Sequence, residues 1–330
     1  MVAKAEIHQS EITTSSGLQV ELINLGATIT SIKLPMKSGT RNVVLSYPEP
    51  KMYQKDNYFL GSTCGRYAGR IGHGRFNLAG KLVNLETLSG SGPHTLHGGP
   101  IGFSRRKWKL DPQMSLQRAE FRLSSKHGEQ GFPGNLKVKV RYEVFDSMKL
   151  VIDFFAKTDM PTIVNLANHS YFNLDGDAKD IRNHYLCLNA DEYTIQDASL
   201  LPTGEIRSVE NSPFDLREPD LLRNQISELK TSSGSSGFDH NFVLRNGSDN
   251  LREAAELTSS KKDLTMRIFT NQPGLQLYTG QYLKEPFGEW SGLCLETQAF
   301  PDSPNQPDFP FSILEPGQIY RKKTVFSFEF

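Results

Sequence analysis

The chain has 330 residues, and its 37 Lys and Arg balance 37 Asp and Glu, so the formal net charge is zero. This length fits one large all-β domain or two ordinary domains. The balanced charge argues against nucleic acid or an anionic membrane as the main partner. No run of 18 apolar residues is present, so we expect no transmembrane helix.

The cysteines and the N-terminal residues indicate a reducing compartment. Cys64, Cys187 and Cys294 are far apart, odd in number and form no CxxC pair. This spacing predicts neither a disulfide framework nor a zinc ribbon, but reduced thiols. The first residues, MVAKAEIHQSEITT, lack the apolar run of a secretory signal. We therefore expect a cytoplasmic protein.

Alternation of apolar and polar residues predicts β-strands along most of the chain. Such alternation places one face of a strand in a core and the other toward solvent. Many strands without interleaved helices are typical of a sandwich or barrel rather than a βαβ sheet. The clearest alternations are at Leu18, Val20 and Leu22; Ala119, Phe121 and Leu123; 136–144; Leu150, Ile152, Phe154 and Ala156; Leu264, Met266 and Ile268; and Phe326, Phe328 and Phe330.

Helical segments are few, and no change in composition divides the chain. Short helices are predicted within residues 49–56 and 216–229. The Ser/Gly stretch from Thr231 to Gly237 looks like a linker, but an aromatic segment follows at once, so we interpret it as a surface loop. We therefore expect one domain over residues 1–330.

The first segment that could carry chemistry is 65–76, with glycines at 65, 69, 72 and 74 and arginines at 66, 70 and 75. Glycines at this density indicate a backbone that bends or closely approaches another group. The arginines offer planar, multi-donor hydrogen bonding, and no phosphate-loop spacing is present. Two interpretations stay open: arginines salt-bridged between β-hairpins, or at least one arginine that donates to ligand oxygens.

Two further segments contain histidines. His94 and His97 could ligate a metal at i, i+3, but a third ligand at metal-site spacing is missing, which favours histidines hydrogen-bonded in a loop. His169 lies in a polar triplet between apolar segments and could act as an acid or a base. Ser170 follows it directly, but adjacent strand residues point to opposite faces, so that histidine cannot easily activate Ser170 as a nucleophile.

Asp239 and Gln276 are short polar groups framed by aromatic residues, in FDHNF at 238–242 and PGLQLYTG at 273–280. Aromatic faces with a few convergent polar groups are typical of a sugar site. Taken alone, Asp239 is better explained as a turn-forming residue.

Glu296 interrupts an apolar run from Gly292 to Leu295, just before a loop with prolines at 301, 304, 307 and 310. A carboxylate at the end of a buried strand is costly unless it is paired or used. Our hypothesis is that Glu296 is a general base on which the other polar segments converge. The alternative is a carboxylate satisfied by backbone N–H groups or an arginine.

Taken in order, these motifs resemble the aldose 1-epimerase (galactose mutarotase) family. The resemblance covers nearly the whole chain, and NHSYFNL with LETQ is its most specific part. The similar strings are GLQVELINLGATITSIKLP, GRYAGRIGHGRF, HTLHGG, NHSYFNL, FDHNF, PGLQLYTG, LCLETQAFPDSPNQP and LEPGQIY.

The resemblance implies an all-β fold, a galactose mutarotase-like β-supersandwich of about thirty antiparallel strands with its active site in a concave cleft. It implies no cofactor and no metal, and an aldose as the small-molecule partner of a monomer or homodimer. By motif position, Glu296 matches the general base and His169 the general acid. The implied sugar-binding residues are Arg70, His97, Ser170, Tyr171, Asp239 and Gln276.

The chain departs from the family pattern at Gly69 and Gln281, where many members have Asn. Loss of the Asn amide could change a contact to a sugar hydroxyl, which bears on substrate preference. Three alternative functions stay open: a glycoside hydrolase using Glu296 and Asp239, a non-catalytic sugar-binding protein, and an epimerase of sugar phosphates using Arg66 and Arg75. An acid–base pair of Glu296 and His169 favours epimerisation, since a binding protein has no need of it.

Overall fold

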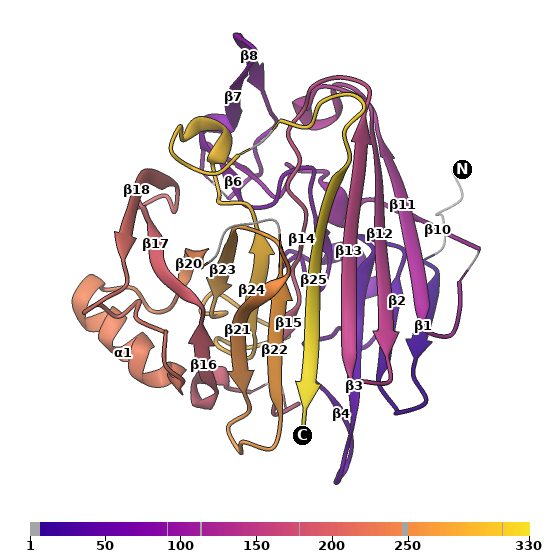
Figure 1. Ribbon diagram of the computed structural model, residues 1–330, viewed down its shortest axis with the longest axis vertical. Coiled ribbons are helices and arrows are strands. Elements are labelled where there is room, and N and C mark those ends of the chain that lie inside the picture. The colour runs from indigo at the N-terminus through magenta and orange to yellow at the C-terminus, as the bar shows by residue number, and fades with distance from the viewer. Residues whose placement is uncertain (1–6, 91, 113, 178, 246–249, 312) are drawn as a thin grey trace.

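The structure is a computed structural model that describes residues 7–90, 92–112, 114–177, 179–245, 250–311 and 313–330. In these ranges the chain forms 25 strands, one α-helix and six short 3₁₀ helices, and the paired strands are antiparallel (Figure 1). The predicted all-β architecture is confirmed, although the strand number is below the thirty expected. No helix of the described ranges has the length and apolar character needed to cross a membrane.

The largest sheet has nine strands and carries the longest alternating segments of the sequence. In spatial order they are β10 (Lys109–Leu110), β11 (Arg118–Ser125), β12 (Leu136–Phe145), β13 (Lys149–Thr158), β25 (Tyr320–Glu329), β22 (Thr265–Thr270), β21 (Arg252–Thr258), β16 (Tyr185–Leu188) and β19 (Asp220–Leu221).

A six-stranded sheet and a four-stranded sheet pack against it. The six-stranded sheet runs β15 (Tyr171–Phe172), β24 (Leu293–Gln298), β23 (Gly274–Tyr278), β20 (Asp239–Leu244), β17 (Ala190–Gln196) and β18 (Pro202–Ser208). The four-stranded sheet runs β1 (Gln9–Thr13), β2 (Gln19–Ile23), β3 (Thr28–Met36) and β4 (Gly39–Asn42). Three small pairs are β14 (Ala167–Asn168) with β5 (Thr63–Cys64), β6 (Arg70–Ile71) with β9 (Thr95–Leu96), and β7 (Arg75–Leu78) with β8 (Lys81–Asn84).

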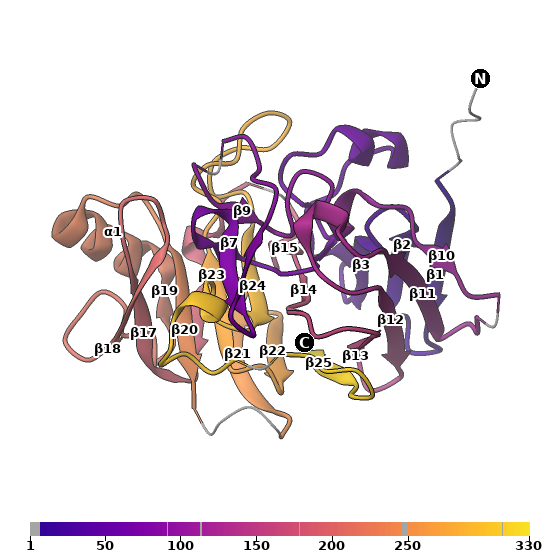
Figure 2. The same cartoon turned by 90° about the horizontal axis from the view of Figure 1, so that it is seen from above.

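The main core lies between the nine-stranded sheet and the other two sheets. Leu277 and Leu295 of the six-stranded sheet belong to the same buried cluster as Ile268 and Phe326 of the nine-stranded sheet. Seen from above, β22 and β25 lie on one side of β23 and β24, while β7 and β9 lie on the other (Figure 2). The six-stranded sheet therefore has one face in the core and one face toward the segment that holds residues 65–99.

Both predicted helices are present, but their bounds differ from the prediction. Helix α1 (Leu222–Ser233) starts later than predicted, because Pro219 and strand β19 precede it. It ends at Gly234, whose φ of 76° closes the last turn. The predicted loop at 231–237 is thus helical in its first part.

One predicted helix is a 3₁₀ helix, and one predicted core residue at the C-terminus is exposed. The predicted helix at 49–56 is a 3₁₀ helix, and Phe330 lies exposed beyond β25, whereas Phe326 and Phe328 are buried as expected. The 3₁₀ helices are η1 (Pro50–Lys55), η2 (Gly72–Gly74), η3 (Phe103–Arg105), η4 (Glu129–Gly131), η5 (Ile181–Asn183) and η6 (Ser303–Asn305).

Candidate active site

The register of three strands gathers polar side chains on the face of the six-stranded sheet that points away from the core. Glu296 of β24 pairs with Gln276 of β23. Asp239 of β20 pairs with Tyr278, two residues further along β23. Since side chains two residues apart on a strand share a face, these residues line one surface. Their sequence neighbours, such as Leu275 and Leu295, fill the core instead.

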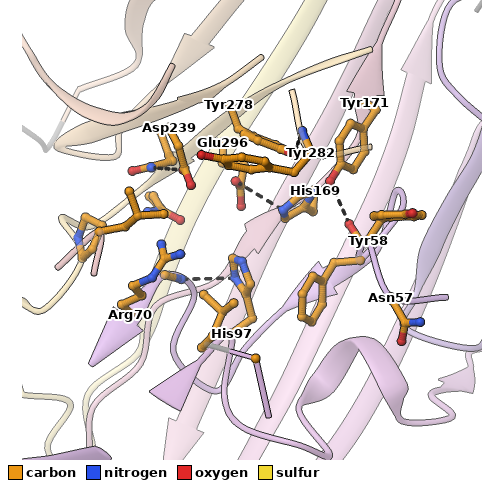
Figure 3. Close-up of a pocket in the computed structure, with 18 residues that line it drawn as sticks. Asn57, Tyr58, Arg70, His97, His169, Tyr171, Asp239, Tyr278, Tyr282 and Glu296 are labelled. Carbon is orange, nitrogen blue, oxygen red and sulfur yellow. Dashed lines mark hydrogen bonds and ion pairs between the residues drawn. The ribbon is translucent and has the colours of Figure 1, made fainter. Parts of the chain in front are cut away.

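A pocket of about 440 Å³ lies over this face, and seven of the eight predicted site residues line it (Figure 3). The exception is Ser170, whose hydroxyl is buried without a hydrogen-bond partner among the described residues and does not line the pocket. The seven residues brought together are Arg70, His97, His169, Tyr171, Asp239, Gln276 and Glu296.

Glu296 and His169 form a buried pair at this pocket. Nε2 of His169 lies 3.5 Å from Oε1 of Glu296, and the side chains are 6% and 3% exposed. Burial, reinforced by the nearby charge of Asp239, raises the pKa of Glu296 well above its ordinary value, against an opposing effect of Arg70. Burial lowers the pKa of His169 to about 4. Both groups are thus biased toward their neutral forms.

The position of Glu296 in its strand differs from the prediction. Strand β24 does not end at Leu295 but continues through Gln298, and all six of its residues are buried. Glu296 is therefore within a strand, because pairing with β23 continues past it. Its Oε2 has no hydrogen-bond partner in the described ranges, so the alternative of a carboxylate satisfied by backbone N–H groups has no support from that atom.

The imidazole of His169 is held from the side opposite Glu296. Its Nδ1 lies 3.4 Å from Sγ of Cys294, which is two residues before Glu296 on β24. The backbone is fixed as well, since His169 N–H donates to Ser62 O and Gly61 N–H donates to His169 O. Strand and loop together aim Nε2 at Glu296.

His97 is fixed in one tautomer by the backbone of Gly69. Gly69 N–H donates to Nδ1 of His97 at 3.2 Å, and His97 N–H donates back to Gly69 O. Burial, with the charges of His169 and Arg70, lowers the pKa of His97 well below its ordinary value. A neutral ring that accepts at Nδ1 carries its proton on Nε2, so His97 is a hydrogen-bond donor to its surroundings.

The metal hypothesis for His94 and His97 is not supported by their positions. His94 accepts from His73 N–H and contacts Ser199 Oγ, and it does not line the pocket. His97 instead lies with Cys64 and Glu296, whose ligand atoms are within 4.8 Å of one another. Neither nitrogen of the His97 tautomer described above is open to an ion, because Nδ1 already accepts and Nε2 carries the proton.

The three arginines of the glycine-rich segment have different surroundings. Arg66 is buried and donates to the carbonyl oxygens of Pro133 and Gly134 and to Ser125 Oγ. Arg70 lines the pocket, and its Nε has no partner among the described residues. Arg75 is exposed. None of the three has a salt bridge in the described ranges, so the salt-bridge interpretation is wrong: one arginine stabilises loops and one points to the pocket.

Replacing Arg66 with Met should destabilise the fold by roughly 2–4 kcal/mol, because several buried carbonyl oxygens would lose their donors. We expect the Michaelis constant of the remaining folded enzyme to be unchanged, since Arg66 does not line the pocket. Urea denaturation followed by circular dichroism measures the first quantity. Arg75→Met, from the same segment but exposed, should leave stability within error; equal loss in both variants would contradict this role.

Asp239 and Gln276 are joined by a hydrogen bond at the pocket, whereas Gln281, the second departure from the family pattern, bonds within the protein away from it. Nε2 of Gln276 donates to Oδ1 of Asp239 at 2.7 Å, which leaves Oε1 of Gln276 without a partner among the described residues. Gln281 accepts from Thr279 Oγ1 and donates to Phe238 O, and it does not line the pocket. Of the two departures from the family pattern, only Gly69 lies at the site.

Several pocket residues were not predicted. Gln298 lies two residues after Glu296 and could have been found from the two-residue period of β24, had the strand been extended correctly. Tyr58 and Tyr282 come from loops, and no sequence pattern indicated them. Tyr282 is 57% exposed, and its ring stacks on that of Tyr278 with 6.3 Å between centroids.

The fold and this site define an all-β protein with an open pocket for a small polar ligand and a buried carboxyl–imidazole pair suited to acid–base chemistry. A family model described as Aldose 1-epimerase matches residues 8–327. The chain therefore belongs to the aldose 1-epimerase family, whose curated members below are named as epimerases and mutarotases, and it is an isomerase.

Individual relatives are similar in sequence to this chain along nearly their whole length. The chain is 37% identical to the aldose 1-epimerase of Escherichia coli (96% of this chain, 94% of that protein) and 39% identical to the galactose mutarotase of Bos taurus (95% and 92%). Among solved structures, the GalM/aldose epimerase homologue from C. elegans superposes with a TM-score of 0.90 at 30% identity, covering 98% of this chain and 99% of that one. The galactose mutarotase-like β-supersandwich is thus confirmed.

Proposed function

We propose that the protein interconverts the α and β anomers of free aldohexoses such as galactose and glucose, with Glu296 as general base and His169 as general acid. The observation that carries the proposal is the buried pair of Glu296 and His169, 3.5 Å apart at a pocket lined by Arg70 and Asp239. The names of the relatives, aldose 1-epimerase and galactose mutarotase, support the substrate class.

The chemistry needs one base and one acid. Glu296 removes the proton of the C1 hydroxyl while His169 delivers a proton to the ring oxygen, and the C1–O5 bond breaks to give the open-chain aldehyde. Rotation about the C1–C2 bond then presents the other face of the carbonyl. Closure reverses both proton transfers. The hydroxyl that carries O5 adds to C1 while His169 takes the proton of that hydroxyl, and Glu296 returns a proton to the carbonyl oxygen. Each positioned transfer contributes about 10²–10⁴-fold in rate.

The protonation of the pair fits a reversible reaction. Because the pKa of Glu296 is raised and that of His169 is lowered to about 4, the pair holds a single proton over the pH range between these two pKa values, and Glu296 is the group that binds it more tightly. Opening starts with that proton on His169 and ends with it on Glu296. Closure starts from the second arrangement, so the two placements serve the two halves of the reaction.

The other pocket groups would orient the sugar. Arg70 and the Nε2–H of His97 offer donors, and Asp239, steadied by Gln276, offers acceptors. Neutral hydroxyls suit this balanced set, and holding them keeps the reacting atoms in register. Arg70 is the one arginine among the described lining residues, which include no lysine, so a sugar phosphate is the weaker candidate.

We expect kcat/KM to show a bell-shaped pH dependence. The acid limb should lie near the lowered pKa of His169, about 4, because below it both groups are protonated and no base remains. The alkaline limb should lie at the raised pKa of Glu296, because above it no proton is left for the acid. Because the two groups interact, the apparent pKa values of both limbs belong to the pair rather than to either residue alone. Rates corrected for the buffer reaction measure them, and a single limb at an ordinary carboxylate pKa would contradict the pairing.

The function is tested by following freshly dissolved α-D-glucose and α-D-galactose in a polarimeter with and without the protein. We expect the optical rotation to reach its equilibrium value faster in proportion to protein concentration. Equilibration no faster than in buffer, across several aldoses, would overturn the proposal and favour a sugar-binding role. Release of free sugar from aryl glycosides would instead indicate a hydrolase.

A further inference from the structure

Gln298 has a buried side-chain amide that faces the pocket and has no partner. It lies on β24 two residues beyond Glu296, lines the pocket and is 1% exposed. Neither Nε2 nor Oε1 has a hydrogen-bond partner among the described residues. A buried amide without hydrogen-bond partners destabilises the folded state. The arrangement therefore indicates a partner that comes from outside the protein.

The other glutamine of the pocket differs in this respect. Nε2 of Gln276 donates a hydrogen bond to Asp239, so part of this amide serves to hold that carboxylate in place. Gln298 keeps two N–H donors and one carbonyl acceptor uncommitted. Such an amide matches a sugar hydroxyl, which donates one hydrogen bond and accepts others.

One glycine leaves room around this amide. It is not Gly274, the register partner of Gln298 on β23, because Asn241 and Phe300 already fill the space beside that residue. It is Gly69, which lines the pocket and where a Cβ atom would lie 3.3 Å from Nε2 of Gln298 and 3.4 Å from Pro301. With φ at 78°, position 69 adopts a conformation that favours glycine. A side chain at position 69 would press on the amide, and its absence leaves the amide accessible.

We propose that Gln298 and Gly69 form a hydroxyl-binding subsite that selects among aldoses. This inference rests on the proposed function. Two residues along a strand span about 6.8 Å, so the backbone places the Gln298 amide one side-chain position further along β24 than the carboxyl of Glu296. It binds a hydroxyl elsewhere on the sugar ring. The ligand class is a neutral aldose that carries this hydroxyl, and the corresponding deoxy sugar is discriminated against.

The test pairs substrate and enzyme changes in a cycle. The kcat/KM of the wild type and of Gln298→Met, which keeps volume but removes the amide, is measured for glucose and for a set of monodeoxy-glucoses. We expect one deoxy sugar to react about ten-fold more slowly than glucose with the wild type, in line with one lost hydrogen bond. For each deoxy sugar, the deoxy ratio is kcat/KM for glucose divided by kcat/KM for that sugar. With Gln298→Met, the deoxy ratio of the one discriminated sugar should fall to near one, while the deoxy ratios of the other sugars stay unchanged.

Gln272→Ala is the matched control. Gln272 is also 1% exposed, but its amide donates to Leu166 O and Tyr320 Oη, and it does not line the pocket. Its loss should lower stability and leave every deoxy ratio as in the wild type. Gly69→Ala gives a second route, since it crowds the amide without removing it, and it should weaken the same single ratio.

The outcomes separate this inference from the function on which it rests. An active wild type whose deoxy ratios are all retained in Gln298→Met, in the folded protein, would overturn the subsite and leave the function intact. A uniform fall for all sugars would also overturn it, because that pattern marks a structural role. A wild type that accelerates no aldose would overturn the proposed function itself.

Discussion

Glu296→Gln is expected to lower kcat by about 10²–10⁴-fold with little change in KM, because it removes the base and preserves shape. Turnover is measured as anomer exchange at equilibrium by NMR, which detects slow rates. Glu253→Gln on β21 is the control: its carboxylate pairs with Arg267, away from the pocket, and its loss should leave turnover unchanged. Wild-type kcat in Glu296→Gln would show that another group takes the C1 proton.

The same substitution should not weaken the fold, and its effect on stability should depend on pH. The pKa of Glu296 is raised above the unfolded value of 4.5. Its contribution to stability is therefore fully present below that value and is lost as pH rises through the folded-state pKa. Gln does not titrate. We expect the melting temperature of the variant to rise relative to that of the wild type as the pH increases above 4.5; a difference that stays constant with pH would contradict the raised pKa.

The strand pattern was predictable because period-2 alternation reflects burial directly. Val138, Val140 and Ile152 alternate in the sequence and are buried in the structure. Strand β24 was harder, because both of its faces are buried and Glu296 interrupted the apolar run. Pairing with β23, which continues the strand to Gln298, depends on a partner elsewhere in the chain. A strand end of this kind cannot be placed from local residues.

The site was predictable as a set of residues but not as a geometry. Arg66 and Arg70 look equivalent in a glycine-rich segment, yet one is surrounded by carbonyl oxygens and the other faces the pocket. Which role each takes is decided by loops near residues 125 and 133 that pack there. Ser170 was included because it adjoins His169, but strand-like alternation turns it away from the pocket.

The buried Cys294 illustrates a contact that no motif indicates. Its thiol lies beside Nδ1 of His169 only because β24 brings it two residues before Glu296. Burial raises its pKa, so the thiol stays protonated. The sequence alone predicts only a reduced thiol at this position, whereas in the structure the thiol packs against the proposed acid.

His169→Asn is expected to reduce kcat by about 10²–10⁴-fold, because Asn cannot deliver a proton to the ring oxygen. The acid limb of the kcat/KM profile near pH 4 should disappear with the imidazole, a change that a merely structural role would not cause. Cys294→Ala, which removes the contact at Nδ1 and keeps the ring, should retain most of the turnover. If His169→Asn keeps wild-type kcat, the nearby Nε2–H of His97 is the alternative donor, and His97→Asn would identify it.

The double variant Glu296→Gln/His169→Asn tests whether the two groups act as one unit. A single proton passes from the C1 hydroxyl to Glu296 as another passes from His169 to the ring oxygen, so neither transfer has a route to products without the other. Once one group is gone, removing the second should cost little more, and the double variant should be about as slow as the slower single variant. Multiplied losses would mean that the two residues act in separate steps, with the 3.5 Å contact between them incidental to the chemistry.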